Sequence, residues 1–134
     1  DQILLDELFF CIRESVDNMK WAGIDGDVFC TKEGKVPFLS VLQMYDCFEQ
    51  IIELFLKTME TIFVRISTDN GNLTLRIMIA QRLEKNNGQP VMIEQVQAVF
   101  DENTRYKVIM EEDEWIIHVE KSVSKSQSSD QGRR

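Results

Sequence analysis

Residue types that build metal and nucleophilic sites are scarce in this chain. It has one histidine, His118, and three cysteines, and no Cys-x-x-Cys pair occurs. The wide spacing and the single imidazole argue against a Cys/His zinc site, and no Ser-His-Asp or Cys-His nucleophile arrangement can be assembled. We expect His118 to be an ordinary strand residue. The cysteines lie in apolar stretches and are expected to be buried free thiols of a reducing compartment: Cys11, Cys30 and Cys47.

Positive charge, phosphate-binding glycine loops and long apolar runs are also lacking. The 134 residues carry 15 Lys and Arg against 23 Asp and Glu, which gives a net charge of −8. An acidic surface repels nucleic acids and anionic membranes. The sequence has no Gly-x-x-x-x-Gly-Lys loop and no apolar run near the roughly 20 residues that span a bilayer. We therefore expect neither nucleic-acid binding nor direct membrane contact.

Three segments have the apolar spacing of amphipathic helices. The first runs from about Ile3 to Trp21 and is followed by Gly23, a residue typical of helix ends. The second runs from about Phe38 to Met59, and its wide apolar face predicts that it is sandwiched. The third starts at Pro90 and continues to Phe100.

Alternation with period two marks two hairpins. Segments 61–68 and 72–80 flank Asp69-Asn70-Gly71, whose Asn-Gly pair favours the positive φ angles of a tight turn. Segments 105–110 and 115–120 flank an acidic turn, 111–114, which we expect to be solvated. One further short strand is expected at 27–31.

The predicted order α-β-α-ββ-α-ββ fits an α+β fold, a two-layer sandwich. We expect a mixed, mostly antiparallel sheet of about five strands with three helices on one face. The domain is expected to cover 1–121, and the polar segment 122–134 is expected to be disordered. The chain begins at Asp1 without Met, so we expect a fragment of a longer protein.

This order of elements resembles the ATP-binding domain of bacterial sensor histidine kinases, the GHKL or Bergerat-fold ATPases. In that family a helix carries an E-x-x-x-N motif, the N-box. A hairpin, a D-x-G-x-G box, a mobile ATP lid, a helix and a final hairpin follow it. Segment 42–49 (LQMYDCFE) resembles the start of the N-box helix, VRIST and NLTLRIMI resemble the hairpin, and 105–121 resembles the closing pair. The resemblance covers nearly the whole ordered chain.

The resemblance implies a nucleotide site with ATP and Mg²⁺ as cofactors. Glu49 takes the position of the N-box Glu, which in the family orients a water near the γ-phosphate, so it is the catalytic candidate. Glu53 takes the position of the Asn that coordinates Mg²⁺, so it is the candidate metal and cofactor ligand. Carboxylate oxygens coordinate hard cations such as Mg²⁺, although the Glu53 carboxylate adds negative charge beside a triphosphate. Lys57 is the candidate phosphate-binding residue.

Two regions depart from the family pattern. The adenine-reading Asp, at the end of the second hairpin strand, falls near Ile79-Ala80-Gln81, where there is neither a carboxylate nor a glycine. An adenine amino group would have no acceptor at such a position. The lid equivalent, 82–89, is short and has one glycine, Gly88. These departures predict weakened or lost nucleotide binding.

A second placement of the N-box lies on the first helix. Glu14 and Asn18 are four residues apart, and Asp69-Asn70-Gly71 then imitates the D-x-G box. This placement inserts an extra strand and helix between the two boxes, and it puts Asp69 in a hairpin turn. Glu and Asn at this spacing are common on solvated helix faces, so we prefer the first placement.

Three functions remain open. The resemblance implies the cytoplasmic C-terminal ATPase domain of a sensor histidine kinase in two-component signalling, whose sensor can be membrane-anchored. Its partners would be the dimerisation and phosphoacceptor helices of the same protein and a response regulator. Its reaction would be phosphoryl transfer from ATP to a His. The lost motifs favour a pseudokinase, a non-catalytic interaction module that signals by protein docking. An unrelated α/β sandwich that serves as a binding domain is the third possibility.

Overall fold

A computed structural model describes residues 1–31, 34–82 and 90–123 of the chain. In chain order the elements are β1 (Gln2–Leu4), α1 (Leu5–Met19), the 3-10 turn η1 (Lys20–Ala22), β2 (Asp25–Cys30), β3 (Lys35–Pro37), α2 (Phe38–Phe55), β4 (Met59–Asp69), β5 (Asn72–Gln81), α3 (Ile93–Gln97), β6 (Arg105–Glu111) and β7 (Glu114–Ser122).

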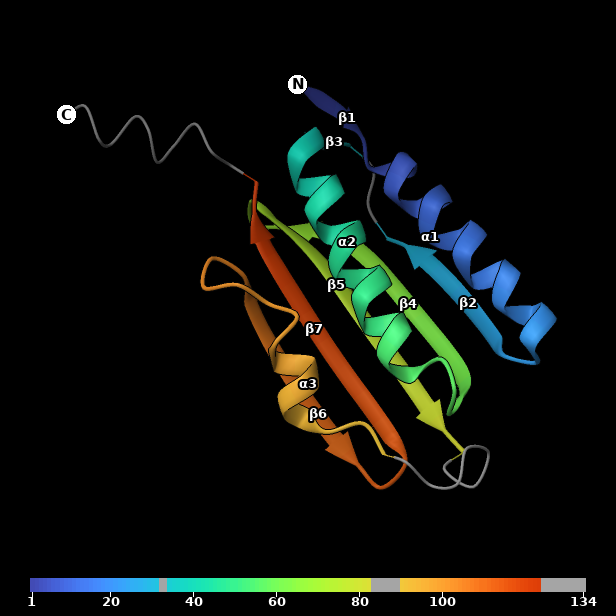
Figure 1. Ribbon diagram of the computed structural model, residues 1–134. Coiled ribbons are helices and arrows are strands. Elements are labelled where there is room, and N and C mark those ends of the chain that lie inside the picture. The colour runs from blue at the N-terminus through green and yellow to red at the C-terminus, as the bar shows by residue number, and fades with distance from the viewer. Residues whose placement is uncertain (32–33, 83–89, 124–134) are drawn as a thin grey trace.

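The main sheet has five strands in the order β2-β4-β5-β7-β6. Strands β2 and β4 run parallel, and the other neighbours are antiparallel. Helices α1, α2 and α3 all lie on one face of this sheet, with α2 between the other two (Figure 1). Strands β1 and β3 form a separate two-stranded sheet at the start of the helices. The predicted α+β two-layer sandwich is confirmed.

The apolar periods of the sequence account for the packing of the two layers. The buried residues of α1 recur every three or four positions, and those of β4, β5 and β7 alternate. The largest side chains in the layer between helices and sheet include Trp115, Phe48 and Phe55, each at most 1% exposed. After η1, Gly23 has φ +80, and this left-handed conformation lets the chain turn towards β2.

All three helices are shorter than the sequence predicts, and α1 covers Leu5–Met19 instead of Ile3 to Trp21, because strand β1 precedes it and a 3-10 turn follows it. Helix α2 ends at Phe55 instead of Met59, because the Thr58 N–H bonds back to the Phe55 carbonyl and Met59 already pairs with Gln81 in the sheet. Helix α3 has five residues, Ile93–Gln97, instead of continuing to Phe100. It ends in tight turns, in which Val99 and Phe100 donate to carbonyls three residues back.

The sequence prediction missed β1 and β3, which have three residues each and are too short to show a period. The predicted tight turn is confirmed, with Asn70 at φ 50 and Gly71 at φ 79. The acidic turn is shorter than predicted, since Glu111 and Glu114 pair as strand ends. The predicted lid and tail lie outside the described residues at 83–89 and from 124 onward, although Ser122 closes β7.

Candidate functional site

Tyr45 and Glu49 of α2 face α1. The Ser15 hydroxyl of α1 lies 3.0 Å from the Tyr45 hydroxyl and donates to Glu49 Oε2 at 3.2 Å. Burial raises the pKa of Tyr45, the hydrogen bond with Ser15 lowers it, and Glu49 raises it further. The carboxylate proposed for water positioning is therefore tied to the α1 side of α2.

Glu53 and Lys57 are exposed and follow Glu49 at the end of α2. Glu53 comes four residues after Glu49 and so lies on the same side of the helix. Within residues 1–31, 34–82 and 90–123, no hydrogen bond or ion pair joins any two of the three, and no group of three His, Cys, Asp or Glu side chains is placed to hold a metal ion. The structure places Glu49 and Glu53 on one side of α2 and Lys57 just beyond its end.

The opposite side of α2 faces β7. Lys121 of β7 donates from Nζ to Thr104 Oγ1 at 3.0 Å, and the Thr104 hydroxyl donates to Asp101 Oδ1 at 2.8 Å. Lys121 lowers the pKa of the Cys47 thiol of α2 and Asp101 raises it, so Cys47 lies on the β7 side of the helix. The helix period then places Gln50 and Leu54, rather than Glu49 and Glu53, on that side.

The end of β5 is closed by a buried hydrogen-bond chain. The Trp115 indole N–H donates to Gln81 Oε1 at 2.9 Å, and Gln81 Nε2 donates to Thr58 Oγ1 at 2.6 Å. These side chains are 1%, 7% and 3% exposed, respectively. The Trp115 ring packs edge-on against Phe55, with centroids 5.1 Å apart. We call these four residues the β5 plug.

The β5 plug stands where the resemblance places the adenine-reading Asp. Of the three residues predicted for that position, Gln81 continues the inward-facing series of β5. Its amide oxygen and nitrogen each already have a partner inside the protein. The sequence did carry a signal for this residue, because a polar residue ends an otherwise apolar alternation.

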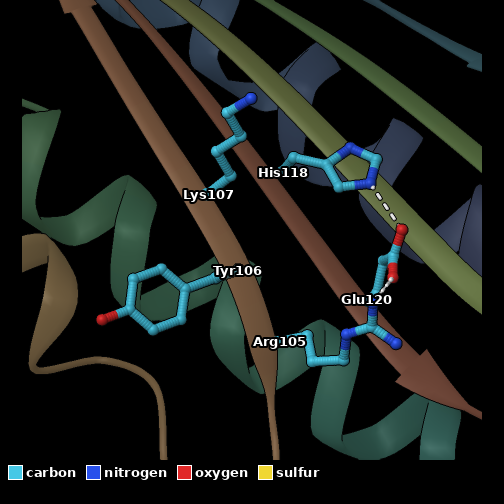
Figure 2. Close-up of a pocket in the computed structure, with 5 residues that line it drawn as sticks. All are labelled: Arg105, Tyr106, Lys107, His118 and Glu120. Carbon is cyan, nitrogen blue, oxygen red and sulfur yellow. Dashed lines mark hydrogen bonds and ion pairs between the residues drawn. The ribbon is translucent and has the colours of Figure 1, made fainter.

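His118 lies on the opposite, helix-free face of the sheet. Its Nε2 is 3.1 Å from Glu120 Oε2, and Arg105 approaches the other oxygen of Glu120 to 3.9 Å. Figure 2 shows these side chains with Lys107 around a hollow of about 200 Å³, while Tyr106 points away from them. There are three further hollows: one over β4, β5 and β7, one at the acidic turn and one near β3. Among the described residues, Glu49, Glu53 and Lys57 line none of these four hollows.

The cysteines differ from the expectation that all three are buried. Cys47 is buried and Cys30 is half-buried, but Cys11 is exposed on α1. An amphipathic helix has an apolar side and a polar side. The sequence alone did not assign Cys11 to the polar, outer side of α1.

This difference predicts unequal thiol reactivity. Burial raises the pKa of Cys47 above that of an ordinary thiol, and Lys121 only partly offsets it. Since the thiolate is the reacting form, we expect Cys47 to react with Ellman's reagent at least about tenfold more slowly than Cys11 at pH 8. The Cys11→Ser variant identifies the fast phase, and denatured protein gives the reference rate. Equal rates in the folded protein would contradict this placement of Cys47.

No protein-family model and no curated protein matches the sequence. Solved structures match it by shape. The histidine kinase AdeS of Acinetobacter baumannii aligns with a TM-score of 0.60 and 8% identity over 92% of this chain and 68% of that one. The catalytic domain of histidine kinase ThkA aligns at 0.59 and 9% identity over 92% and 95%. The mycobacterial sensor histidine kinase MprB aligns at 0.58 and 13% identity over 92% and 97%. The chain therefore has the fold of histidine kinase catalytic domains.

None of the helices in the described ranges has both the length and the apolar character that crossing a bilayer requires.

Proposed function

We propose that this chain is the ATPase-type domain of a sensor histidine kinase in two-component signalling, and that it has weakened or lost nucleotide binding. Its fold supports the first part, since it is similar to that of AdeS, ThkA and MprB. In this proposal the domain acts on the dimerisation and phosphoacceptor helices of its own protein, and through them on a response regulator, in the cytoplasm.

The β5 plug is the observation that carries the loss of binding. A base that enters the end of β5 would need a free acceptor, and Gln81 Oε1 already accepts from the Trp115 indole. Breaking that bond leaves a buried donor or acceptor unpaired, which costs about 1–3 kcal/mol. An adenine would therefore have to displace existing interactions before it gained its own.

The metal and phosphate positions support the same conclusion. Glu49 already accepts from Ser15 on the α1 side, and Glu53 and Lys57 are exposed without a bond to it among the described residues. In place of the family's neutral Asn, Glu53 would set a further carboxylate beside the triphosphate, which disfavours a Mg-nucleotide held as the family holds it. We therefore favour the pseudokinase, which keeps the fold and signals by protein docking, over an active kinase. Should some nucleotide bind, Glu49, Glu53 and Lys57 stay the proposed water-, metal- and phosphate-binding residues.

A thermal-shift titration with ATP and ADP, with and without Mg²⁺, tests this proposal. A ligand at 100 times its Kd stabilises the native state by about 2.7 kcal/mol, so an active domain responds clearly at millimolar ATP. We expect no dose-dependent rise in Tm. The variant Glu53→Asn restores the family's metal ligand, and its Tm is also expected not to rise with ATP, because the β5 plug remains closed.

A histidine kinase catalytic domain known to bind ATP serves as the positive control. A saturable rise in Tm of this chain with Mg-ATP would show that the pocket survives and would contradict the proposal. A rise confined to Glu53→Asn would show that the metal position, rather than the β5 plug, is the main defect.

A further inference from the structure

The helix-free face of the sheet carries three rows of side chains that run across the strands. The registers align Ile109, Ile116, Met78, Phe63 and, on the edge strand β2, Asp27 in a middle row. On one side of it lies an acidic row, Glu111, Glu114, Ala80, Thr61 and Asp25. On the other side lies a basic row, Lys107, His118, Arg76, Arg65 and Phe29.

On β4, β5, β6 and β7 the middle row is apolar, although no helix of the described chain covers it (Figure 1). Its β2 residue, Asp27, pairs with Arg13 of α1 at the edge of the sheet. Phe63 and Ile109 are 37% and 36% exposed, and Phe29 beside the row is 47% exposed and contacts Phe63 with the two rings tilted and their centroids 5.0 Å apart. A hollow of about 230 Å³ opens on this face, with Phe63, Met78 and Ile116 in its wall. A contiguous apolar strip rimmed by polar residues is typical of an interaction surface.

The flanking rows place like charges side by side. Arg65 lies directly across from Arg76, and Glu111 directly across from Glu114. Within the described ranges, Arg65, Arg76, Lys107, Glu111 and Glu114 form no ion pair. Like charges on opposed positions of neighbouring strands destabilise a sheet. A partner that sets an acid against Lys107 and a base against Glu111 would offset part of this repulsion.

A second copy of the same face has that arrangement on β6 and β7, whereas Arg76 and Arg65 would face the partner's Ala80 and the partner's Thr61. A two-fold axis along the middle row keeps the order of the strands and exchanges the two flanking rows. Lys107 then faces the partner's Glu111, His118 faces the partner's Glu114, and the apolar rows meet each other. Packed sheets lie about 10 Å apart, which is within the combined reach of a Lys and a Glu side chain. The contact is self-complementary, as an isologous interface must be.

We propose that the helix-free face is a self-association surface, and that two copies of this domain pack on it sheet against sheet. The inference does not depend on nucleotide binding, because the face lies on the side of the sheet away from α2 and the β5 plug. Four strands about 4.8 Å apart and three rows about 6.7 Å apart give a footprint of roughly 400 Å² with side chains. A standard interface has about 800 Å² per partner, so we expect a weak dimer with a micromolar or higher Kd.

Sedimentation equilibrium of the 134-residue chain without nucleotide, up to millimolar protein, tests this inference. We expect a concentration-dependent dimer that weakens at high salt, because the flanking rows attract each other through charge. Lys107→Glu places a carboxylate opposite Glu111 twice in each dimer and is expected to raise the Kd by about tenfold or more. Glu111→Lys is expected to do the same.

Mixing the two variants is the most specific arm of the experiment. The chain with Lys107→Glu carries two acids where the chain with Glu111→Lys carries two lysines, so both contacts are restored in the heterodimer. We expect the mixture to associate within about threefold of the natural chain. Lys35→Glu, on the separate β1–β3 sheet, makes the same charge change and is expected to leave the Kd unchanged.

Circular dichroism first establishes that each variant is folded. A chain that stays monomeric at millimolar concentration would overturn the inference. A dimer that Lys107→Glu does not weaken, or a mixture that associates no better than the separate variants, would assign association to another surface and overturn it equally. None of these outcomes depends on ATP, so they leave the proposed function to its own test.

Discussion

Replacing Trp115 with Ala is expected to lower the free energy of unfolding by about 3–5 kcal/mol. The indole is 1% exposed and lies against Phe55 in the layer between helices and sheet. Its removal leaves a cavity and also deprives Gln81 Oε1 of its buried donor. Urea unfolding followed by circular dichroism measures the change. A domain of this size has a total stability of about 5–15 kcal/mol, so the variant is expected to be close to unfolding at 37 °C.

Trp115→Phe separates the two contributions. It keeps much of the aromatic packing but removes the N–H, and we expect a loss of about 1–3 kcal/mol from the unpaired Gln81 oxygen and reduced volume. The second tryptophan, Trp21, is 91% exposed, so Trp21→Ala is the matched control, with a change within about 0.5 kcal/mol. If Trp115→Ala proved as stable as Trp21→Ala, the β5 plug would not be part of the core.

Gly26→Ala is expected to lower the free energy of unfolding by about 1–3 kcal/mol, because the added methyl group is crowded by its neighbours. Gly26 of β2 pairs with Ile62 of β4, and α1 crosses directly above it. A Cβ at this glycine would lie 2.7 Å from the Ile62 Cγ2 methyl group, 2.8 Å from the Ile62 carbonyl oxygen and 2.8 Å from a Val16 methyl group. The carbonyl belongs to the sheet backbone, so it cannot move away as a flexible side chain can.

The same urea measurement tests this prediction. Asp25→Ala changes the exposed neighbour in the same strand and is expected to stay within about 0.5 kcal/mol of the natural chain. The double variant Val16→Ala with Gly26→Ala removes one of the three crowded contacts and is expected to stay destabilised, because both contacts with Ile62 remain. Unchanged stability of Gly26→Ala would contradict the close approach of α1, β2 and β4.

The sequence predicted the long elements well because their apolar periods repeat several times. Five buried positions fix the inner side of α1, and the Asn70-Gly71 turn fixes the register of the β4–β5 hairpin. Strands β1 and β3 have three residues each, which is less than two periods of alternation. The end of α2 was misjudged since the apolar pattern continues to Met59, and only the pairing of that residue with Gln81 shows that it belongs to the sheet.

The candidate site was harder to predict than the fold. The four-residue spacing of Glu49 and Glu53 shows that they share a side of α2, but not that this side faces α1. The hydrogen bonds of Gln81 join residues 23 and 34 positions apart, so they exist only in the folded chain. The rows on the helix-free face are likewise invisible without the strand order, because each row takes its residues from five strands.

The most direct test of the lost nucleotide site is the indole N–H signal of Trp115 in a ¹⁵N–¹H spectrum. This proton sits in the hydrogen bond to Gln81 at the position where adenine would be read, and the exposed Trp21 supplies the internal reference. Addition of Mg-ATP to millimolar concentration is predicted to leave both signals in place. A saturable shift of the Trp115 signal, with Trp21 unmoved, would show nucleotide at the end of β5 and would contradict the account.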